Sequence, residues 1–251
     1  MPNLPQLTER LLAKERVFKA PPFNAKMVDA LSLIAPQFEF EPSEECRDYW
    51  EANQNAACWG EYEALKGIFA ELPKPRRVLE IGPGMGRSVV FFSKMLNWHD
   101  VTFDLYEGNG SEGSYGLLRE RSETTFYGCI PLLKECLAYN EQSNYRVFDA
   151  QDLECRLDRL PGGYDYIYSF YSVGWHWSLE HFLDELASVM GDSTLAVFTI
   201  PDRFEPFEKL QFFYWSVIEW EAAWPANRKL RLLLLSKSNV LQIPDPSRSA
   251  L

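Results

Sequence analysis

Several features that would place a protein in a particular class are missing from this 251-residue chain. No apolar run approaches the ~20 residues that cross a membrane, and the first residues lack the apolar core of a signal peptide. We therefore expect a cytoplasmic protein with no membrane partner. Basic runs are also absent, and 25 Lys and Arg against 36 Asp and Glu give a net charge of −11. Because proteins bind nucleic acid mainly by neutralising phosphates, this acidic balance predicts no nucleic-acid partner.

Cysteine and histidine are scarce, and their spacing matches no common metal site. The five cysteines form no Cys-x-x-Cys pair and have no histidine at the spacing of zinc ligands. We predict reduced, mostly buried thiols and no bound metal; the cysteines are Cys46, Cys58, Cys129, Cys136 and Cys155.

The chain does contain enough apolar material for a large core. Of its residues 46% are hydrophobic and 15% aromatic, and its length suits one α/β domain with an extension. Strand-like runs alternate with helix-like runs, which predicts a mostly parallel sheet. Strands are expected at Arg77–Ile81, Val101–Tyr106, Tyr145–Phe148, Tyr166–Phe170 and Thr194–Ile200, and helical segments at about 86–96, 110–139, 179–190 and from Pro206 onward.

Both ends of the chain extend this core. Residues 1–74 have helix-like apolar spacing and are followed by Pro75. We predict a helical extension or lid that packs over a pocket; its alternative uses are to cover the sheet or to form a homodimer contact. Near the other end, Val217–Glu221 and Lys229–Ser236 indicate two strands joined by a short turn, which predicts an antiparallel hairpin. Residues 75–251 would then form one domain.

A glycine-rich turn, Gly82-Pro83-Gly84-Met85-Gly86, follows the first strand. A strand, such a turn and a helix together build a nucleotide-like pocket at the carboxyl edge of an α/β sheet. Without a Cβ the backbone can turn sharply and approach a ligand, and the N–H groups of the next helix point at that ligand. Glu80 lies two residues before the turn, where a carboxylate suits an ammonium group and repels a pyrophosphate.

The run Glu-x-Gly-x-Gly-x-Gly resembles motif I of the class I S-adenosylmethionine (SAM)-dependent methyltransferases. In that family the acid and the glycine turn hold the aminocarboxypropyl end of the cofactor, so the resemblance assigns this role to Glu80, Gly82, Pro83, Gly84 and Gly86. It implies a Rossmann-like seven-stranded sheet, mostly parallel with a C-terminal antiparallel hairpin. Dinucleotide-binding folds also use a glycine turn, but with Gly-x-Gly-x-x-Gly spacing and further parallel strands.

An acid closes the second strand. Glu107, followed by Gly108, lies 25 residues after Gly82, where an acid of this fold class accepts hydrogen bonds from the ribose hydroxyls. Asp104 is the alternative for that role, although its run of residues looks buried on both faces. A solvated loop acid is the alternative interpretation of Glu107.

After the third strand, the stretch Asp-Ala-Gln-Asp-Leu resembles the family's Asp-Ala-x-Asp-Leu segment. There an aspartate and the next backbone N–H contact adenine. The resemblance implies that Asp149 accepts from the exocyclic amine and that the Ala150 N–H donates to a ring nitrogen. Asp152 is equally suited to be the N-cap of a short turn.

The segment after the fourth strand, residues 169–178, carries the candidate general base. In the family this segment lies beneath the methyl group of the cofactor and faces the acceptor, so Ser169 and Phe170 are expected beside the cofactor. His176 has the side chain best suited to act as a base near neutral pH. Natural-product O-methyltransferases often carry His-Asp-Trp in a similar segment, whereas this chain has His-Trp. A packing role between two tryptophans is the alternative.

The resemblance thus predicts a SAM-dependent methyltransferase acting on a hydroxyl of a small molecule, a sugar or a secondary metabolite, with His176 as base. The segment is also similar to that of sequences assigned as sugar O-methyltransferases, which often have an aromatic–Gly–aromatic–His stretch there. Side chains that would line the acceptor site are Trp50, Trp59, Tyr62, Tyr171 and Trp175. The alternatives are a catalytically silent SAM-binding module and, disfavoured by Glu80 and the terminal hairpin, a nicotinamide-dependent oxidoreductase.

Overall fold

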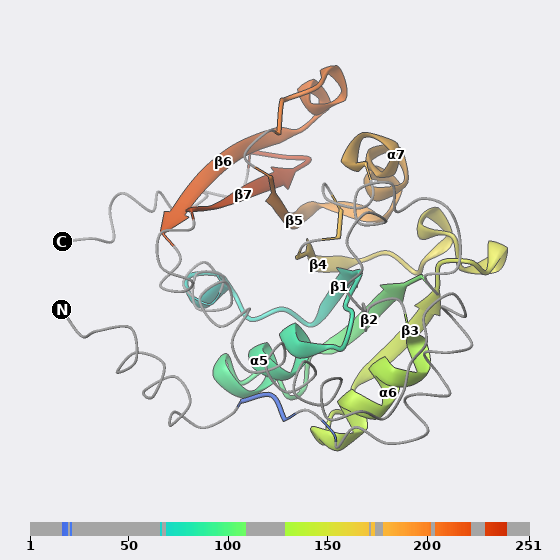
Figure 1. Ribbon diagram of the computed structural model, residues 1–251. Helices are drawn as coiled ribbons and strands as arrows, with labels where there is room; N and C mark the ends of the chain where they lie inside the picture. Colours follow the sequence, from blue (N-terminus) through green and yellow to red (C-terminus); the bar gives the residue numbers. More distant parts are fainter. Residues whose placement is uncertain are drawn as a thin grey trace, which may run out of the picture.

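The computed structural model describes residues 17–19, 21, 66, 69–108, 129–170, 172–173, 178–201, 204–221 and 229–239. Within these ranges strands alternate with helices, as the sequence predicts (Figure 1). The elements are β1 (Arg77–Ile81), α5 (Arg87–Met95), β2 (Thr102–Glu107), α6 (Ile130–Tyr139), β3 (Tyr145–Asp149), the 3₁₀ turns η1 (Leu153–Cys155) and η2 (Leu157–Arg159), β4 (Tyr164–Ser169), α7 (Leu179–Val189), β5 (Met190–Ile200), η3 (Glu208–Phe212), β6 (Tyr214–Glu221) and β7 (Lys229–Ser236).

The strands form one seven-stranded sheet in the order β3-β2-β1-β4-β5-β7-β6. The first five strands along the chain pair in parallel, and β7 pairs antiparallel with both β5 and β6. This confirms the predicted α/β class and the predicted antiparallel hairpin. The order reverses between β1 and β4, which is the point where open α/β sheets bind ligands beyond the carboxyl ends of their strands.

Two apolar layers cover the two faces of the sheet, since the parallel strands are buried on both sides. One layer packs Val78, Phe103 and Tyr168 against α5 and α6, and the other packs Leu79, Ile167 and neighbouring strand residues against α7. Figure 1 shows α5 and α6 on one side of the sheet and α7 on the other.

The segment before β1 contributes to the first of these layers. Phe69 is 2% exposed, and its ring lies 5.2–6.1 Å from the rings of Phe92, Trp98, Tyr166 and Tyr168. Aromatic pairs at these separations add to the stabilisation that comes from burial itself. Most of the predicted extension at 1–74 lies outside the described residues.

Helices α5 and α6 end in the same way. Asn97 and Glu141 have φ values of 56° and 60°, and the next residue of each loop donates back into its helix: Trp98 N to Ser93 O at 3.1 Å, and Gln142 N to Leu137 O at 2.9 Å. These are the left-handed residues and 6→1 hydrogen bonds of Schellman caps. The two caps turn the chain into β2 and β3 at the amino edge of the sheet.

The prediction of a helix after Pro206 is wrong. Only a 3₁₀ turn forms there, and the chain is extended at Phe213 and enters β6 at Tyr214. Pairing with β7 explains this, because Trp215 lies opposite Leu235 in the antiparallel ladder. Strand pairing has outweighed a helical spacing of aromatic residues.

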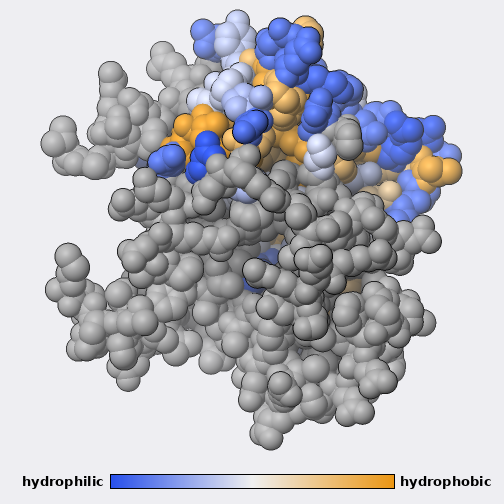
Figure 2. All heavy atoms as spheres, turned by 45° about the horizontal axis from the view of Figure 1, so that its top comes forward, coloured by the Kyte–Doolittle hydropathy of each residue, from blue (hydrophilic) through white to orange (hydrophobic). Residues whose placement is uncertain are grey.

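The described surface near β6 and η3 mixes apolar and polar side chains. Phe212 is 74% and Tyr214 53% exposed, and Figure 2 shows apolar and hydrophilic atoms interspersed on this face. Within the described ranges no helix is both long and apolar enough to cross a bilayer.

Candidate cofactor site

The glycine turn has the backbone shape that its sequence requires. Gly82, Gly84 and Gly86 have φ values of 70°, 56° and 72°, a region that side chains with a Cβ rarely adopt. A Cβ on Gly82 would lie 2.1 Å from Ser172 Oγ, and a Cβ on Gly86 would lie 2.6 Å from the Leu137 side chain. The turn therefore has no room for a larger residue at either end.

Main-chain hydrogen bonds fix this turn to the neighbouring strand and helix. The Gly82 N–H donates to Tyr106 O at 2.9 Å, and the Gly86 N–H donates to Pro83 O at 2.9 Å. Gly86 is the N-cap of α5 and supplies no side chain to its first turn. The first turn of α5 therefore faces the carboxyl edge without a side-chain cap, as expected of a helix that receives a ligand.

Glu80 lies beneath α5, in the apolar layer between sheet and helix. Its side chain is 2% exposed and accepts hydrogen bonds from Ser88 Oγ and, at 3.2 Å, from the Tyr168 hydroxyl. Burial raises the pKa of Glu80 to about 7, although both hydrogen bonds and nearby Arg87 oppose the rise. Contact between Glu80 and a cofactor ammonium stays a prediction; what the structure shows is that Glu80 ties β1 to α5 and β4.

Glu107 lies at the carboxyl end of β2, next to the glycine turn. One carboxylate oxygen accepts from the Gly84 N–H at 2.7 Å, and the other accepts from the Gly108 N–H at 3.0 Å. The side chain is 4% exposed, which rules out the solvated loop acid. Burial raises its pKa to about 8 against the effect of these two hydrogen bonds.

Asp104, the rival acid, is committed to a structural network elsewhere. It is fully buried and accepts hydrogen bonds from Arg77 (2.5 Å), Arg146 (2.8 Å) and the Tyr164 hydroxyl (2.9 Å). It lies three residues before the edge at which Glu107 meets the turn. Of the two acids, only Glu107 contacts the glycine turn.

This difference predicts separable effects of mutation. Asp104→Asn should lower the free energy of unfolding by about 2–4 kcal/mol, because two guanidinium groups lose a buried anion, while the dissociation constant for SAM changes less than about threefold. Urea denaturation and calorimetry measure the two quantities. A loss of SAM affinity as large as that of a Glu107 variant would return the ribose role to Asp104.

Asp149 ends β3 directly opposite Glu107 in the parallel register. Its side chain accepts from the Gln151 N–H at 2.9 Å, and Asp152 accepts from the Glu154 N–H at 2.9 Å as the N-cap of η1. One prediction needs correction. The Ala150 N–H donates to Glu107 O at 2.8 Å, so the sheet already uses the donor that we assigned to adenine.

The chain leaving β4 is anchored against the end of β1. Ser169 Oγ donates to Ile81 O at 2.7 Å and accepts from the Val173 N–H at 3.0 Å. Phe170 stacks on Tyr168, with 4.8 Å between ring centroids. Ser169 and Phe170 thus hold the start of this segment in place, and Ser172 packs on Gly82.

Several predicted residues fall outside the described ranges, namely His176, Tyr171, Trp175, Trp50, Trp59 and Tyr62. Conversely, sequence reasoning missed Ser88, Ser172 and Tyr168, which contact Glu80 or the glycine turn. The position of Ser88 in the first turn of the helix after the motif was a usable signal. The other two depend on the pairing of β4 with β1, and nothing local in the sequence indicates them.

The described edge fits an adenosyl amino acid. The glycine turn, Glu107 and Asp149 lie in sequence order across the adjoining ends of β1, β2 and β3. Buried acids suit an ammonium group and ribose hydroxyls, and a positively charged sulfonium suits an acidic edge. The described residues contain no cluster of three potential metal ligands.

Comparison with known proteins agrees with this geometry. A family model described as a methyltransferase domain matches residues 49–233, which is most of the chain. The chain therefore belongs to the methyltransferase domain family. Its glycine turn and its strand order of 3-2-1-4-5-7-6 are those of a class I methyltransferase. The cofactor is therefore SAM. The alternative of a nicotinamide-dependent enzyme is excluded by this family membership.

Solved structures of methyltransferases are similar to this chain at low sequence identity. The O-methyltransferase TomG from Streptomyces achromogenes is 15% identical, with a TM-score of 0.49, over 85% of this chain and 91% of that chain. Magnesium protoporphyrin IX methyltransferase ChlM from Synechocystis PCC 6803 is 18% identical, with a TM-score of 0.42, over 86% and 93%. Podospora anserina methyltransferase PaMTH1 is 12% identical, with a TM-score of 0.42, over 93% and 97%. No curated protein matches the chain.

Proposed function

We propose that this methyltransferase transfers the methyl group of SAM to a hydroxyl of a small molecule, a sugar or a secondary metabolite. The observation that supports the proposal is the anchoring of the segment after β4. Ser172 lies against Gly82, and Ser169 bridges Ile81 and Val173. The chain that carries His176 therefore starts at the floor of the cofactor site.

In this proposal the residues at the end of each strand bind a different part of the cofactor. The turn from Gly82 to Gly86 receives the aminocarboxypropyl group, Glu107 accepts from the ribose hydroxyls and Asp149 accepts from the adenine amine. SAM supplies a methyl group already activated on a sulfonium. Most of the protein's contribution is then to align the acceptor with the methyl carbon.

His176 would act on the acceptor. As the acceptor oxygen bonds to the methyl carbon, the carbon–sulfur bond breaks and its electron pair stays on sulfur. The imidazole takes the hydroxyl proton, a contribution of typically ~10²–10⁴-fold. Tyr171, Trp175, Trp50, Trp59 and Tyr62 are the proposed acceptor-lining residues.

A panel of hydroxylated sugars and phenols, with release of S-adenosylhomocysteine as the readout, tests this function. We expect turnover with at least one member, and His176→Ala should lower kcat by about 100-fold or more while the SAM dissociation constant changes less than about threefold. His99→Ala serves as the matched control, because His99 lies at the amino edge of the sheet. Unchanged kcat in His176→Ala would exclude the base role, and tight SAM binding without turnover on any acceptor would favour the silent SAM-binding module.

A further inference from the structure

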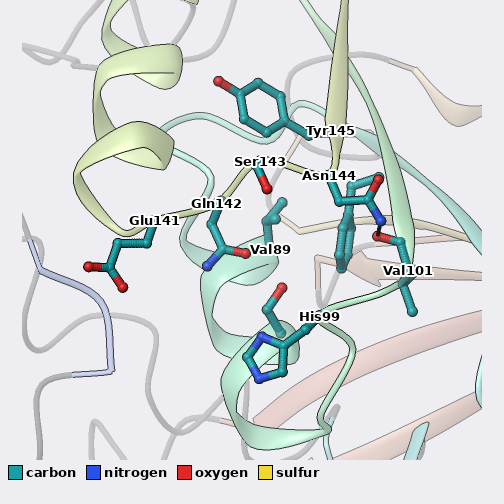
Figure 3. A pocket seen from close by; sticks show the side chains of 10 residues that line it. Val89, His99, Val101, Glu141, Gln142, Ser143, Asn144 and Tyr145 are labelled. Carbon is teal, nitrogen blue, oxygen red and sulfur yellow. Dashed lines mark hydrogen bonds between the residues drawn. The ribbon is translucent and has the colours of Figure 1, made fainter.

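A cavity lies at the edge of the sheet opposite the glycine turn. It has a volume of about 170 Å³ and opens between α5, the start of β2 and the loop from α6 to β3 (Figure 3). Most of its lining is polar, and Val89, Val101 and Phe103 contribute a small apolar part. The Schellman cap after α6, with Glu141 and Gln142, forms part of its wall, and no residue assigned to the cofactor site lines it.

Ser93 places an unused polar group in this cavity. The residue is 1% exposed and lines the cavity, and its hydroxyl forms no hydrogen bond within the described part of the chain. Ser93 Oγ is not among the fully buried polar atoms that lack a partner, so the hydroxyl reaches the cavity. A ligand in the cavity could therefore form a hydrogen bond with it.

Two amide side chains on the loop after α6 are held with their nitrogens turned toward the main chain. Gln142 Nε2 donates to Asn140 O at 3.0 Å, and Asn144 Nδ2 donates to Val101 O at 2.8 Å, the dashed line in Figure 3. Neither side-chain oxygen accepts a hydrogen bond from the described residues. Since an amide nitrogen fixed in this way also fixes its oxygen, the rim offers acceptors for a ligand that donates.

The surrounding charges also favour a cation. The C-terminal ends of α5 and α6, where helix carbonyls carry partial negative charge, both lie at this cavity. Lys94, in the last turn of α5, donates its ammonium to Val17 O at 2.8 Å. The Glu141 carboxylate points away from the other labelled side chains in Figure 3, so it adds negative potential without direct contact.

We propose that this cavity is a binding site for a small organic cation, a protonated amine on a short aliphatic group. The aliphatic part would cover Val89, Val101 and Phe103. The ammonium would donate to Ser93 Oγ and to the side-chain oxygens of Gln142 and Asn144. This site is separate from methyl transfer and does not depend on the acceptor.

Titration with isobutylammonium chloride, followed by ¹H–¹⁵N NMR at constant ionic strength, tests the site. The cation should shift the amide signals around Ser93 and of the loop containing Gln142 and Asn144, in a saturable manner with a dissociation constant of about 1 mM, as expected for a ligand of this size. Isobutanol, which has the same shape without charge, should bind at least tenfold more weakly, because hydrogen bonds to charged groups are the stronger ones.

Two sets of variants locate the ligand. Ser93→Ala should weaken isobutylammonium binding roughly tenfold, whereas Ser188→Ala, at an exposed serine of α7, should leave it unchanged. Gln142→Glu should tighten binding several-fold and Gln142→Lys should abolish it. The proposal fails if the cation gives no saturable shift, if isobutanol binds equally well, or if Ser93→Ala and both Gln142 variants bind like the wild type.

Discussion

Replacing Gly82 by alanine is expected to abolish measurable SAM binding and to lower the free energy of unfolding by more than about 3 kcal/mol. Two costs combine. The residue has φ +70°, and the new Cβ would lie 2.1 Å from Ser172 Oγ and 2.4 Å from Ser172 Cβ. Neither atom is the free end of a long side chain, so the turn or the segment after β4 must move. Calorimetry with SAM and urea denaturation measure the two losses.

The chain offers a matched control for this change. Gly163 has nearly the same φ, +68°, but a Cβ there would meet no atom within 4 Å. Gly163→Ala should therefore cost only the backbone strain, about 1–2 kcal/mol, and should leave SAM affinity intact. In the double variant Gly82→Ala, Ser172→Gly the steric part of the loss should return, as a double-mutant cycle would show. Equal losses in the two alanine variants would mean that Ser172 does not restrict the turn.

Glu107→Ala is expected to weaken SAM binding by about 100-fold. Above pH 8 the buried group beside the glycine turn is a carboxylate that would accept from both ribose hydroxyls, and hydrogen bonds to a charged group contribute about 1.5–3 kcal/mol each. The variant also leaves the Gly84 N–H without its partner at 2.7 Å. Titration calorimetry with S-adenosylhomocysteine measures the change. A loss below about threefold would show that Glu107 organises the turn but does not bind the ribose.

The raised pKa of Glu107 gives this prediction a pH dependence. With a pKa of about 8, the carboxyl is mostly protonated below that pH, and the ionised form is the better acceptor. Affinity for 5′-methylthioadenosine, which keeps the ribose but lacks the titrating amino group of SAM, should rise from pH 6 to 8, by at most tenfold per pH unit, and level off above. Glu107→Gln should remove most of this slope. A flat profile in the wild type would contradict the ribose role.

The raised pKa of Glu107 has the opposite effect on the stability of the protein without cofactor. Between pH 4.5 and about 8 the folded state retains a proton that the unfolded chain has released. Stability therefore falls as pH rises through this window, while cofactor affinity increases.

Much of the fold could be predicted because its strands are short apolar runs with clear ends. The predicted limits of β1 and β7 agree with the structure, since both are nearly continuous runs of branched residues. The start of β5 was predicted four residues late, at Thr194, because the strand begins at Met190 with exposed Gly191, Asp192 and Ser193. Those residues resemble a loop locally and become strand only through the pairing of Met190 with Tyr164.

The role of a site residue could be predicted where that role follows from the position of the residue along its strand. The preference for Glu107 over Asp104 followed from its place at the end of β2, and contact with Gly84 supports that choice. The hydrogen bond from Tyr168 to Glu80 and the use of the Ala150 N–H were not predictable. Both depend on which strands become neighbours, and contacts between residues up to 88 positions apart leave no local pattern in the sequence.

The insertion of β7 between β5 and β6 has a consequence for synthesis on the ribosome. When residue 221 has been made, β6 has no neighbour among the strands that the structure describes, because it pairs with β7 alone of these, and β5 still has an open edge. An open edge of this kind invites pairing with other chains. The sheet cannot be completed at this edge until residues 229–236 emerge from the ribosome. We therefore expect the nascent protein to need protection from aggregation until β7 is available.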